Sequence, residues 1–268
     1  MPRAAPGLAR AVQRHENPLC RNVSLNRLPM SAPLAERLRP RTMDEYIGQE
    51  HLVGKNGVFR KFFETGNVPS FILWGPPGVG KTTLARIVAT QLERPFFTLS
   101  AVTSGVKEVR EVIESARKQR FFDQRPPFLF IDEIHRFNKS QQDSLLGAVE
   151  QGVVTLIGAT TENPSFEVIS PLLSRCQVYI LKSMEDKDLR TLLDRALETD
   201  TELKNREIEI EETGALFRFS GGDARKLLNI LDIVVGATDG KVVISDKQVT
   251  DCLQQNIALY DKNGEQHY

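Results

Sequence analysis

The feature that most constrains the fold is a glycine-rich turn between an apolar run and a helical segment. The turn matches GxxxxGK[ST] and consists of Gly75, Pro76, Pro77, Gly78, Val79, Gly80, Lys81 and Thr82. It follows the apolar run 71–74 and precedes the helical segment 83–89, which is the context in which the pattern binds phosphate. Glycines let the backbone curl until successive N–H groups face anionic oxygens, and the helix N-terminus adds partial positive charge. We expect this turn and Thr83 to bind a nucleotide, with Lys81 on the β- and γ-phosphates and Thr82 on Mg²⁺.

Five short apolar runs alternate with helical segments from residue 68 onward, at 71–74, 95–99, 128–131, 153–157 and 177–181. Because their apolar residues are consecutive and not alternate, we expect strands buried on both faces, as in a parallel sheet. The alternation predicts an α/β fold of the P-loop type, with a doubly wound parallel five-stranded sheet. After residue 183 helical stripes take over at 189–197 and 224–235, one strand is expected at 242–244, and Ser245 can cap a further helix. We predict a nucleotide-binding αβα domain over 31–182 and a small helical lid domain over 183–258.

Polar residues follow two of the apolar runs. Asp132 and Glu133 end the third run, where α/β sheets place ligands. Asp132 is expected to hold Mg²⁺ through its water shell, and Glu133 to polarise the attacking water as a general base. The fourth run leads into Thr160, which is expected near the γ-phosphate. Taken alone, both segments also fit ordinary strand ends.

Composition excludes several classes of protein. Equal numbers of basic and acidic residues, 35 each, give no net charge, and 40% apolar content is typical of a chain with a real core. No run approaches the roughly 18–20 apolar residues of a membrane span. The 3 cysteines and 4 histidines are scattered, so neither a disulfide framework nor a zinc site is expected, and free thiols favour a reducing, cytosolic compartment.

An arginine-rich arm precedes the first structured-looking segment. Residues 1–41 hold eight arginines against Glu16 and Glu36. The favoured interpretation of 1–30 is a disordered basic tail. Contact with nucleic acid, an organelle transit peptide, and a mistaken start upstream of Met30 remain as alternatives.

Further motifs carry a resemblance to a known family. They lie at 33–40, 47–49, 73–78, 132–140, 158–164, 174–176 and 221–225. In these motifs the chain resembles AAA+ ATPases of the clamp-loader clade. It resembles most narrowly the replication-associated recombination protein A family, whose eukaryotic relative is the Werner-helicase-interacting protein. The resemblance runs from about residue 33 to 268 and implies that 259–268 begin a C-terminal oligomerisation domain missing here.

The resemblance implies roles for residues outside the phosphate loop. An adenine pocket is implied at Tyr46, Ile47 and Gly48. Thr160 is implied as the first sensor, with Thr161 as the fallback. Two arginines are implied to stabilise charge on the transferred phosphoryl group: Arg175 as a finger acting on a neighbouring subunit's ATP, and Arg225 as the second sensor in the lid. By residue type alone, Arg175 also fits a solvated helix end and Arg225 the exposed side of an apolar helix.

The resemblance also implies an activity and partners. It implies a DNA-dependent ATPase that hydrolyses ATP to ADP and phosphate with Mg²⁺, acting in replication-fork maintenance, repair and recombination at stalled forks. Implied partners are single-stranded, gapped or forked DNA bound without sequence preference, other copies of the chain (a tetramer in the family), and replication proteins such as single-strand-binding protein. The implied location is the cytoplasm, on the nucleoid, and no membrane contact is expected.

DNA contact is also expected from basic residues near helix starts, at Lys107, His135, Arg136 and Lys139. A solvated charged face is the alternative. Rival functions are a branch-migration or helicase-type motor, a clamp-loader subunit, a protein remodeller and a non-hydrolysing scaffold. The segment 100–107 has no aromatic residue, which disfavours the remodeller, since those proteins carry an aromatic–glycine pore loop there. The presence of every catalytic residue disfavours the scaffold.

Overall fold

The computed structural model describes residues 32–120 and 125–254. The predictions for the arm at 1–30, including a start at Met30, and for 259–268 lie outside the described residues.

Five parallel strands form the central sheet in the order β2-β3-β4-β1-β5. They are β1 (Phe71–Trp74), β2 (Phe96–Ser100), β3 (Phe128–Asp132), β4 (Thr155–Thr160) and β5 (Gln177–Ile180). The predicted five-stranded, doubly wound parallel sheet is confirmed. Because all strands run the same way, the segments that follow β1, β3 and β4 emerge at one edge of the sheet.

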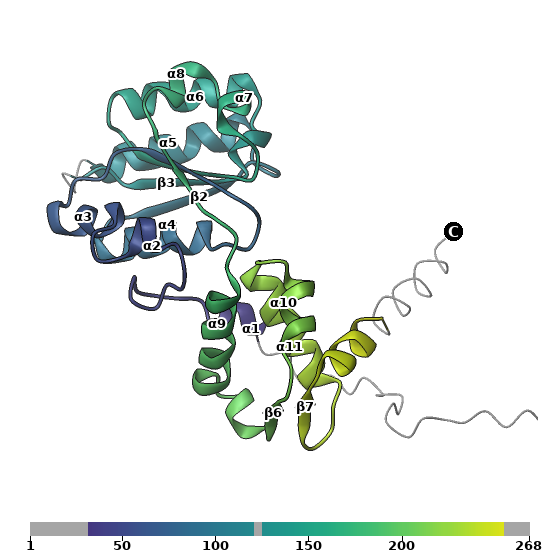
Figure 1. Ribbon diagram of the computed structural model, residues 1–268. Coiled ribbons are helices and arrows are strands. Elements are labelled where there is room, and N and C mark those ends of the chain that lie inside the picture. The colour runs from purple at the N-terminus through teal and green to yellow at the C-terminus, as the bar shows by residue number, and fades with distance from the viewer. Residues whose placement is uncertain (1–31, 121–124, 255–268) are drawn as a thin grey trace, which may run out of the picture. The chain divides into compact units, whose positions relative to one another are not determined.

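Helices cover both faces of this sheet (Figure 1). Phe71 and Leu73 of β1 join the core beneath α2 (Glu50–Val53), α3 (Val58–Thr65) and α4 (Lys81–Gln91). Ile72, which points the other way, joins the core beneath α5 (Val106–Arg120), α6 (Lys139–Glu150) and α8 (Ser170–Leu173). The short α7 (Pro164–Glu167) precedes α8. Side chains that alternate between two apolar layers explain why the strands are apolar at most positions.

Three strands differ from the prediction: β2, at one edge of the sheet, has an exposed Thr98 and only Leu99 buried. β5 lies at the other edge of the sheet, and its Val178 and Ile180 are 39% and 51% exposed. The prediction of burial on both faces was wrong here, because an apolar run does not reveal that its strand has one neighbour only. β4 continues to Thr160 instead of ending at 157. Gly158 lets it pack closely, since a Cβ there would lie 3.2 Å from the Ile134 side chain.

A second core lies in the helical lid. It joins α9 (Asp186–Thr199), α10 (Gly214–Ser220), α11 (Ala224–Gly236) and β7 (Val242–Ile244). The 3-10 helix η2 (Leu203–Asn205) leads to β6 (Ile208–Ile210), which pairs in parallel with β7 and was not predicted. Residues 246–254 are helical, and the Ser245 hydroxyl accepts a hydrogen bond from the Gln248 N–H at 3.3 Å.

The first helix, α1 (Leu34–Arg37), packs with the lid although it precedes the sheet in the chain. Leu34 and Leu38 are buried in the lid core, whereas Met43 and Tyr46 belong to the core beneath α4. The prediction that grouped all residues from 31 onward with the αβα domain was therefore wrong for α1. The segment 38–46 connects the lid with the nucleotide-binding domain.

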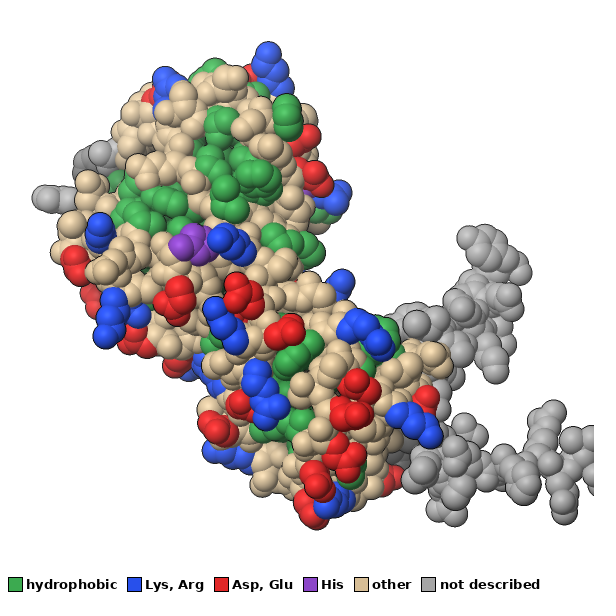
Figure 2. Space-filling model, in the orientation of Figure 1, with side chains coloured by type: hydrophobic (Ala, Val, Ile, Leu, Met, Phe, Trp, Pro, Cys, Tyr) green, Lys and Arg blue, Asp and Glu red, His purple; other side chains and the backbone are tan. Residues whose placement is uncertain are grey.

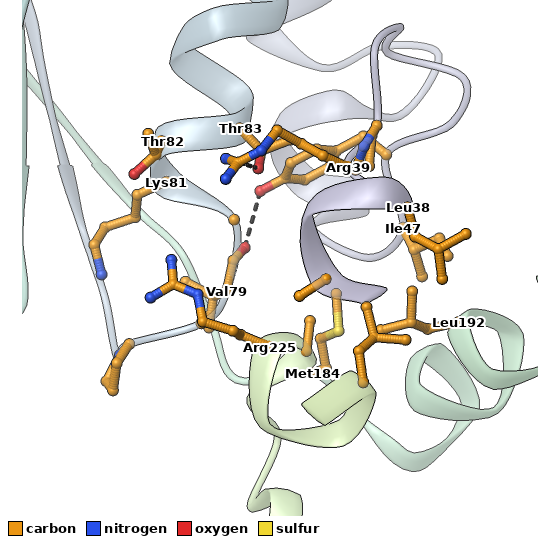
Figure 3. A pocket seen from close by; sticks show the side chains of 18 of the residues that line it. Leu38, Arg39, Ile47, Val79, Lys81, Thr82, Thr83, Met184, Leu192 and Arg225 are labelled. Atoms are coloured by element: carbon orange, nitrogen blue, oxygen red, sulfur yellow. Dashed lines mark hydrogen bonds between the residues drawn. The ribbon is translucent and has the colours of Figure 1, made fainter. Parts of the chain in front are cut away.

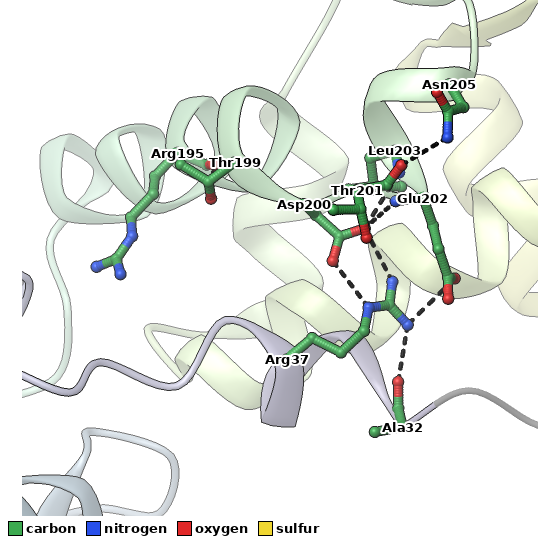
Figure 4. Close-up of polar contacts among 9 residues, drawn as sticks. All are labelled: Ala32, Arg37, Arg195, Thr199, Asp200, Thr201, Glu202, Leu203 and Asn205. Atoms are coloured by element: carbon green, nitrogen blue, oxygen red, sulfur yellow. Dashed lines mark hydrogen bonds and ion pairs between the residues drawn. The ribbon is translucent and has the colours of Figure 1, made fainter.

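An ion pair fixes α1 to the lid (Figure 4). Arg37 donates from Nε and Nη2 to the two carboxylate oxygens of Asp200, at 2.8 and 3.0 Å. The Asp200 side chain is 3% exposed and also accepts the N–H groups of Glu202 and Leu203. Burial raises the pKa of Asp200, but the hydrogen bonds from Arg37 and the backbone outweigh it and hold that pKa below its ordinary value.

Candidate functional site

The phosphate loop, residues 75–80, connects β1 to α4. Gly78 and Gly80 have φ values of +70° and +93°, a region that side-chain-bearing residues disfavour. Neighbouring atoms also leave no room for a side chain at two glycines of this loop. A Cβ on Gly80 would lie 2.6 Å from the Tyr46 hydroxyl oxygen, and a Cβ on Gly75 would lie 2.3 Å from the Leu181 carbonyl oxygen. The glycines therefore allow both the curl of the loop and its close packing.

Lys81 opens α4 and lies beneath the loop. Its ammonium group donates to the carbonyl oxygens of Gly75 at 2.7 Å and Pro76 at 2.8 Å. Burial lowers the pKa of Lys81, and the carboxylates of Glu133 and Asp132 oppose this effect. A buried cation that two nearby acids support is suited to bind an anion.

Asp132 ends β3 and Glu133 follows it, and both line the same pocket as Lys81 and Thr82. Glu133 has a φ of +54°, in the left-handed region, and begins the 3-10 helix η1 (Ile134–Arg136). A non-glycine residue held in this conformation is a common feature of functional sites. The oxygen donors of Thr82 and Asp132 fit Mg²⁺, which proteins hold through one or two side chains together with substrate phosphates. Among the described residues no group of three or more His, Cys, Asp or Glu side chains could hold a metal ion. The described residues therefore contain no metal site built from several carboxylates.

The other end of the pocket is apolar (Figure 3). Its lining comes from both domains: Ala35, Leu38, Tyr46, Ile47, Met184, Leu192, Ala224 and Leu228. Of the predicted adenine-pocket residues, Tyr46 and Ile47 line the pocket, and the Tyr46 hydroxyl donates to the Val79 carbonyl at 2.9 Å. Gly48 is not a lining residue; a Cβ on it would lie 3.2 Å from Asp188 Oδ2. An apolar end suits a flat base, while the loop end suits phosphates.

The lid contributes one cation to the pocket. Arg225, at the start of α11, lines it, and Figure 3 shows the ends of Arg225 and Lys81 pointing toward the same space. Asp223 accepts a hydrogen bond from the Lys226 N–H at 3.0 Å and so caps α11. The same carboxylate lies against the loop, since a Cβ on Gly78 would come 1.7 Å from its Oδ1. The lid therefore contacts the phosphate loop directly.

Arg39 is a pocket residue that the sequence reasoning missed. Its Nη1 lies 3.4 Å from the Thr83 Oγ1 (Figure 3), and it pairs with Glu36 three residues earlier. The neighbouring Pro40 also lines the pocket. Nothing in the periodicity of the chain marks these positions, because they reach the site only through the packing of α1 on the lid.

Besides Gly48, the predicted residues Gly75, Pro76, Thr160 and Arg175 lie outside the pocket lining. Thr160 ends β4 beside Trp74 of β1, fully buried, and its hydroxyl contacts His135 and the backbone of Glu162. Arg175 follows α8, donates to the Pro171 carbonyl at 2.6 Å and pairs with Glu150 at 2.5 Å. The Arg175 side chain is 40% exposed, so it is available to a neighbouring molecule.

The basic residues predicted to contact DNA differ in exposure. Lys139 begins α6 after a capping box formed by Asn138 and Gln141, and Lys107 and Arg136 are exposed as well. His135 differs from these exposed residues, because its side chain is 12% exposed and is turned toward Thr160. Figure 2 shows a face on which basic and acidic side chains are interspersed, so that face carries no large basic area.

A parallel sheet whose phosphate loop is contacted by a helical lid is the architecture of the AAA+ ATPases, and the chain is one of them. The family model described as "ATPase family associated with various cellular activities (AAA)" matches residues 71–184, and the one described as "AAA C-terminal domain" matches 202–268. A solved RuvB of Thermotoga maritima, titled a Holliday junction branch migration motor, has a TM-score of 0.63 and is 30% identical, covering 81% of this chain and 72% of that chain.

Curated relatives define the family within this class. The Escherichia coli K12 replication-associated recombination protein A is 44% identical over 243 residues, which are 88% of this chain and 54% of the relative. The Dictyostelium discoideum ATPase WRNIP1 is 43% identical over 258 residues, 88% of this chain and 29% of the relative. The chain belongs to the family of replication-associated recombination protein A and WRNIP1. It spans about half the length of the bacterial relative and less of the Dictyostelium one.

The described helices include none that is long and apolar enough to cross a membrane.

Proposed function

We propose that this chain binds ATP with Mg²⁺ and hydrolyses it to ADP and phosphate. One observation carries the proposal: a single pocket joins the phosphate loop, the acid pair of β3 and Arg225 of the lid. Each part meets a need of phosphoryl transfer, which depends on positioning and on stabilising charge that spreads over the phosphate oxygens.

The chain's own groups divide the work. Lys81 gives up its carbonyl partners for the β- and γ-phosphate oxygens, and the loop N–H groups bind the rest of the triphosphate. Glu133 accepts a proton from the attacking water, and Arg225 neutralises charge from within the subunit. Thr82, and Asp132 through the water shell of the ion, would hold Mg²⁺, which would supply positive charge to offset the negative charge of the phosphate oxygens.

Replacing Glu133 by glutamine tests the hydrolytic role. The amide keeps the shape of the side chain but is not a base, and loss of a general base slows reactions by about 10²- to 10⁴-fold. We expect the variant to bind ATP with wild-type affinity and to show hydrolysis reduced to that extent. A variant that hydrolyses ATP at the wild-type rate would rule out this role for Glu133.

We assign Arg175 to a neighbouring copy's ATP, because it is exposed and absent from its own pocket. An arginine finger contributes about 10³- to 10⁵-fold in rate. Arg175→Ala and Lys81→Ala subunits should be nearly inactive alone and regain hydrolysis when mixed, since each can complete the other's defect. If folded and assembled mixtures recover nothing, action between subunits is excluded. If the mixture does regain hydrolysis, the active form is an oligomer, for which the family implies a tetramer.

We further propose that DNA stimulates the ATPase and that the chain acts at stalled replication forks and in recombination. The names of the relatives support this, as do the exposed basic residues Lys107 and Lys139 at helix starts and Arg136 at the end of η1. A cytoplasmic place on the nucleoid, with single-strand-binding protein as a neighbour, would follow. Hydrolysis measured without DNA and with single-stranded, gapped and forked DNA should differ, and DNA affinity should fall steeply with salt. Equal rates throughout would contradict DNA dependence.

A branch-migration motor is the second candidate, favoured by the structural similarity to RuvB. The two functions separate in an assay with a four-way DNA junction. ATP-driven separation of the junction's arms supports the motor, whereas DNA-stimulated hydrolysis without separation supports the fork-maintenance function.

A further inference from the structure

His135 lies between the acid pair and the end of β4. Its Nδ1 is 3.0 Å from the Thr160 Oγ1 and 3.4 Å from the Glu133 Oε2. The imidazole comes from η1, which follows Glu133 directly. Ile134, in the same turn, is fully buried against Gly158 of β4, so the packing of this turn fixes where the ring lies.

The hydrogen bonds around Thr160 favour one position for the proton of the His135 ring. The Thr160 hydroxyl donates to the Glu162 carbonyl at 3.1 Å and accepts from the Glu162 N–H at 3.0 Å. A hydroxyl has a single proton to donate, so with that proton on the Glu162 carbonyl the contact with His135 is one in which the ring N–H donates. The nearby Glu133 carboxylate gives a second reason, because it would repel an unprotonated nitrogen and attract an N–H. Both neighbours therefore favour the Nδ1–H tautomer, with the N–H closer to Thr160 than to Glu133.

We propose that His135 is a positioning residue for hydrolysis, whose Nδ1–H holds the Glu133 carboxylate in the orientation that the attacking water requires. The inference rests on the proposed function. The same N–H contacts the Thr160 hydroxyl. If nucleotide binding changes the hydrogen-bond partners of that hydroxyl, the His135 ring passes the change on to the Glu133 carboxylate. In this way the base and the sensor respond together to the γ-phosphate.

The ring is placed to do this without touching the substrate. His135 is not among the residues that line the pocket, whereas Glu133 is. Loss of His135 should therefore leave ATP affinity unchanged and act on the rate of the chemical step. Misplacing a catalytic group by about 1 Å can cost around 100-fold in rate.

Three substitutions separate positioning from packing. Asparagine can place an N–H close to the position of Nδ1, glutamine reaches the position of Nε2 instead, and alanine has neither. We expect kcat to fall about 10- to 100-fold in His135→Ala and His135→Gln with KM unchanged, and to recover substantially in His135→Asn. In a Glu133→Gln background, His135→Ala should cause little further loss, because the two residues act as a unit. His51→Ala, at an exposed histidine away from the pocket, is the matched control with wild-type kcat.

A spectroscopic measurement tests the contact without turnover. Long-range ¹H–¹⁵N correlation of the histidine rings should give the Nδ1–H tautomer for His135. The Nε2–H tautomer, or a His135→Ala protein with wild-type kcat, overturns the inference while the wild type still hydrolyses ATP. Equal losses in the asparagine and glutamine variants also overturn it, because packing alone would then explain them. A wild-type chain that hydrolyses no ATP overturns the proposed function itself, and this role with it.

Discussion

Replacing Gly78 by alanine tests the contact between the phosphate loop and the lid. The added Cβ would lie 1.7 Å from the Asp223 Oδ1, far inside van der Waals contact. Asp223 would have to move, and it would lose its hydrogen bond to the Lys226 N–H at the start of α11. The substitution therefore disturbs the lid from a position in the other domain.

The expected cost has two parts. Alanine at a φ of +70° costs about 1 to 2 kcal/mol relative to glycine. Loss of an Asp helix cap costs about 1 kcal/mol. The sum is about 2 to 3 kcal/mol, which lowers the melting temperature by roughly 4 to 12 °C for a chain of this size.

Thermal and urea unfolding without nucleotide measure this cost, and Gly66→Ala is the matched control. Gly66 has a similar φ of +66° but no heavy atom within 4 Å of an added Cβ, so only the backbone part applies. Asp223→Ala should cost about 1 kcal/mol alone and nothing further in the Gly78→Ala background. If Gly78→Ala is no more destabilising than Gly66→Ala, or if the two losses simply add, the loop and lid do not touch as described.

Three further predictions concern other parts of the structure. Arg37→Ala leaves the buried Asp200 carboxylate without its cation and should cost about 3 kcal/mol. Because the folded-state pKa of Asp200 is lowered, the difference in unfolding free energy between the wild type and Arg37→Ala should have its full value above about pH 4 and shrink as the pH falls below it. A free-energy difference that grows in acid would contradict the pairing. Tyr46→Phe leaves the Val79 carbonyl without its buried partner, so urea unfolding should show a loss of about 1 to 2 kcal/mol and ATP titration a weaker affinity; unchanged values would refute this. Burial raises the pKa of Cys176 to about 12, so at pH 8 its thiol should be alkylated only on unfolding, as followed by mass spectrometry, and fast labelling of the folded protein would argue against that environment.

Local signals in the sequence predict the phosphate loop and the acid pair well. The loop needs glycines, a lysine and a hydroxyl at fixed spacing between a strand and a helix, and all of these are neighbours in the chain. The Asp132-Glu133 pair is likewise visible because it directly follows a buried run. The order of strands in the sheet is not visible in this way, which is why the exposure of β5 was missed.

What the sequence could not predict depends on contacts between distant segments. Arg39 reaches the pocket because Leu34 and Leu38 pack into the lid. In the sequence these leucines are marked by their four-residue spacing and by the motif at 33–40, and neither signal says which domain they join. His135 looked like a basic surface residue until the packing of Ile134 against β4 placed it beside Thr160.

A crystal structure of the chain with a non-hydrolysable ATP analogue and Mg²⁺ tests the central claim most directly. The account predicts the triphosphate along residues 75–82, the metal at Thr82 with Asp132 in its water shell, the base between Ile47 and the lid, and the Glu133 carboxylate facing the γ-phosphate. A nucleotide bound elsewhere, or carboxylates of Asp132 and Glu133 turned away from the phosphates, would contradict it.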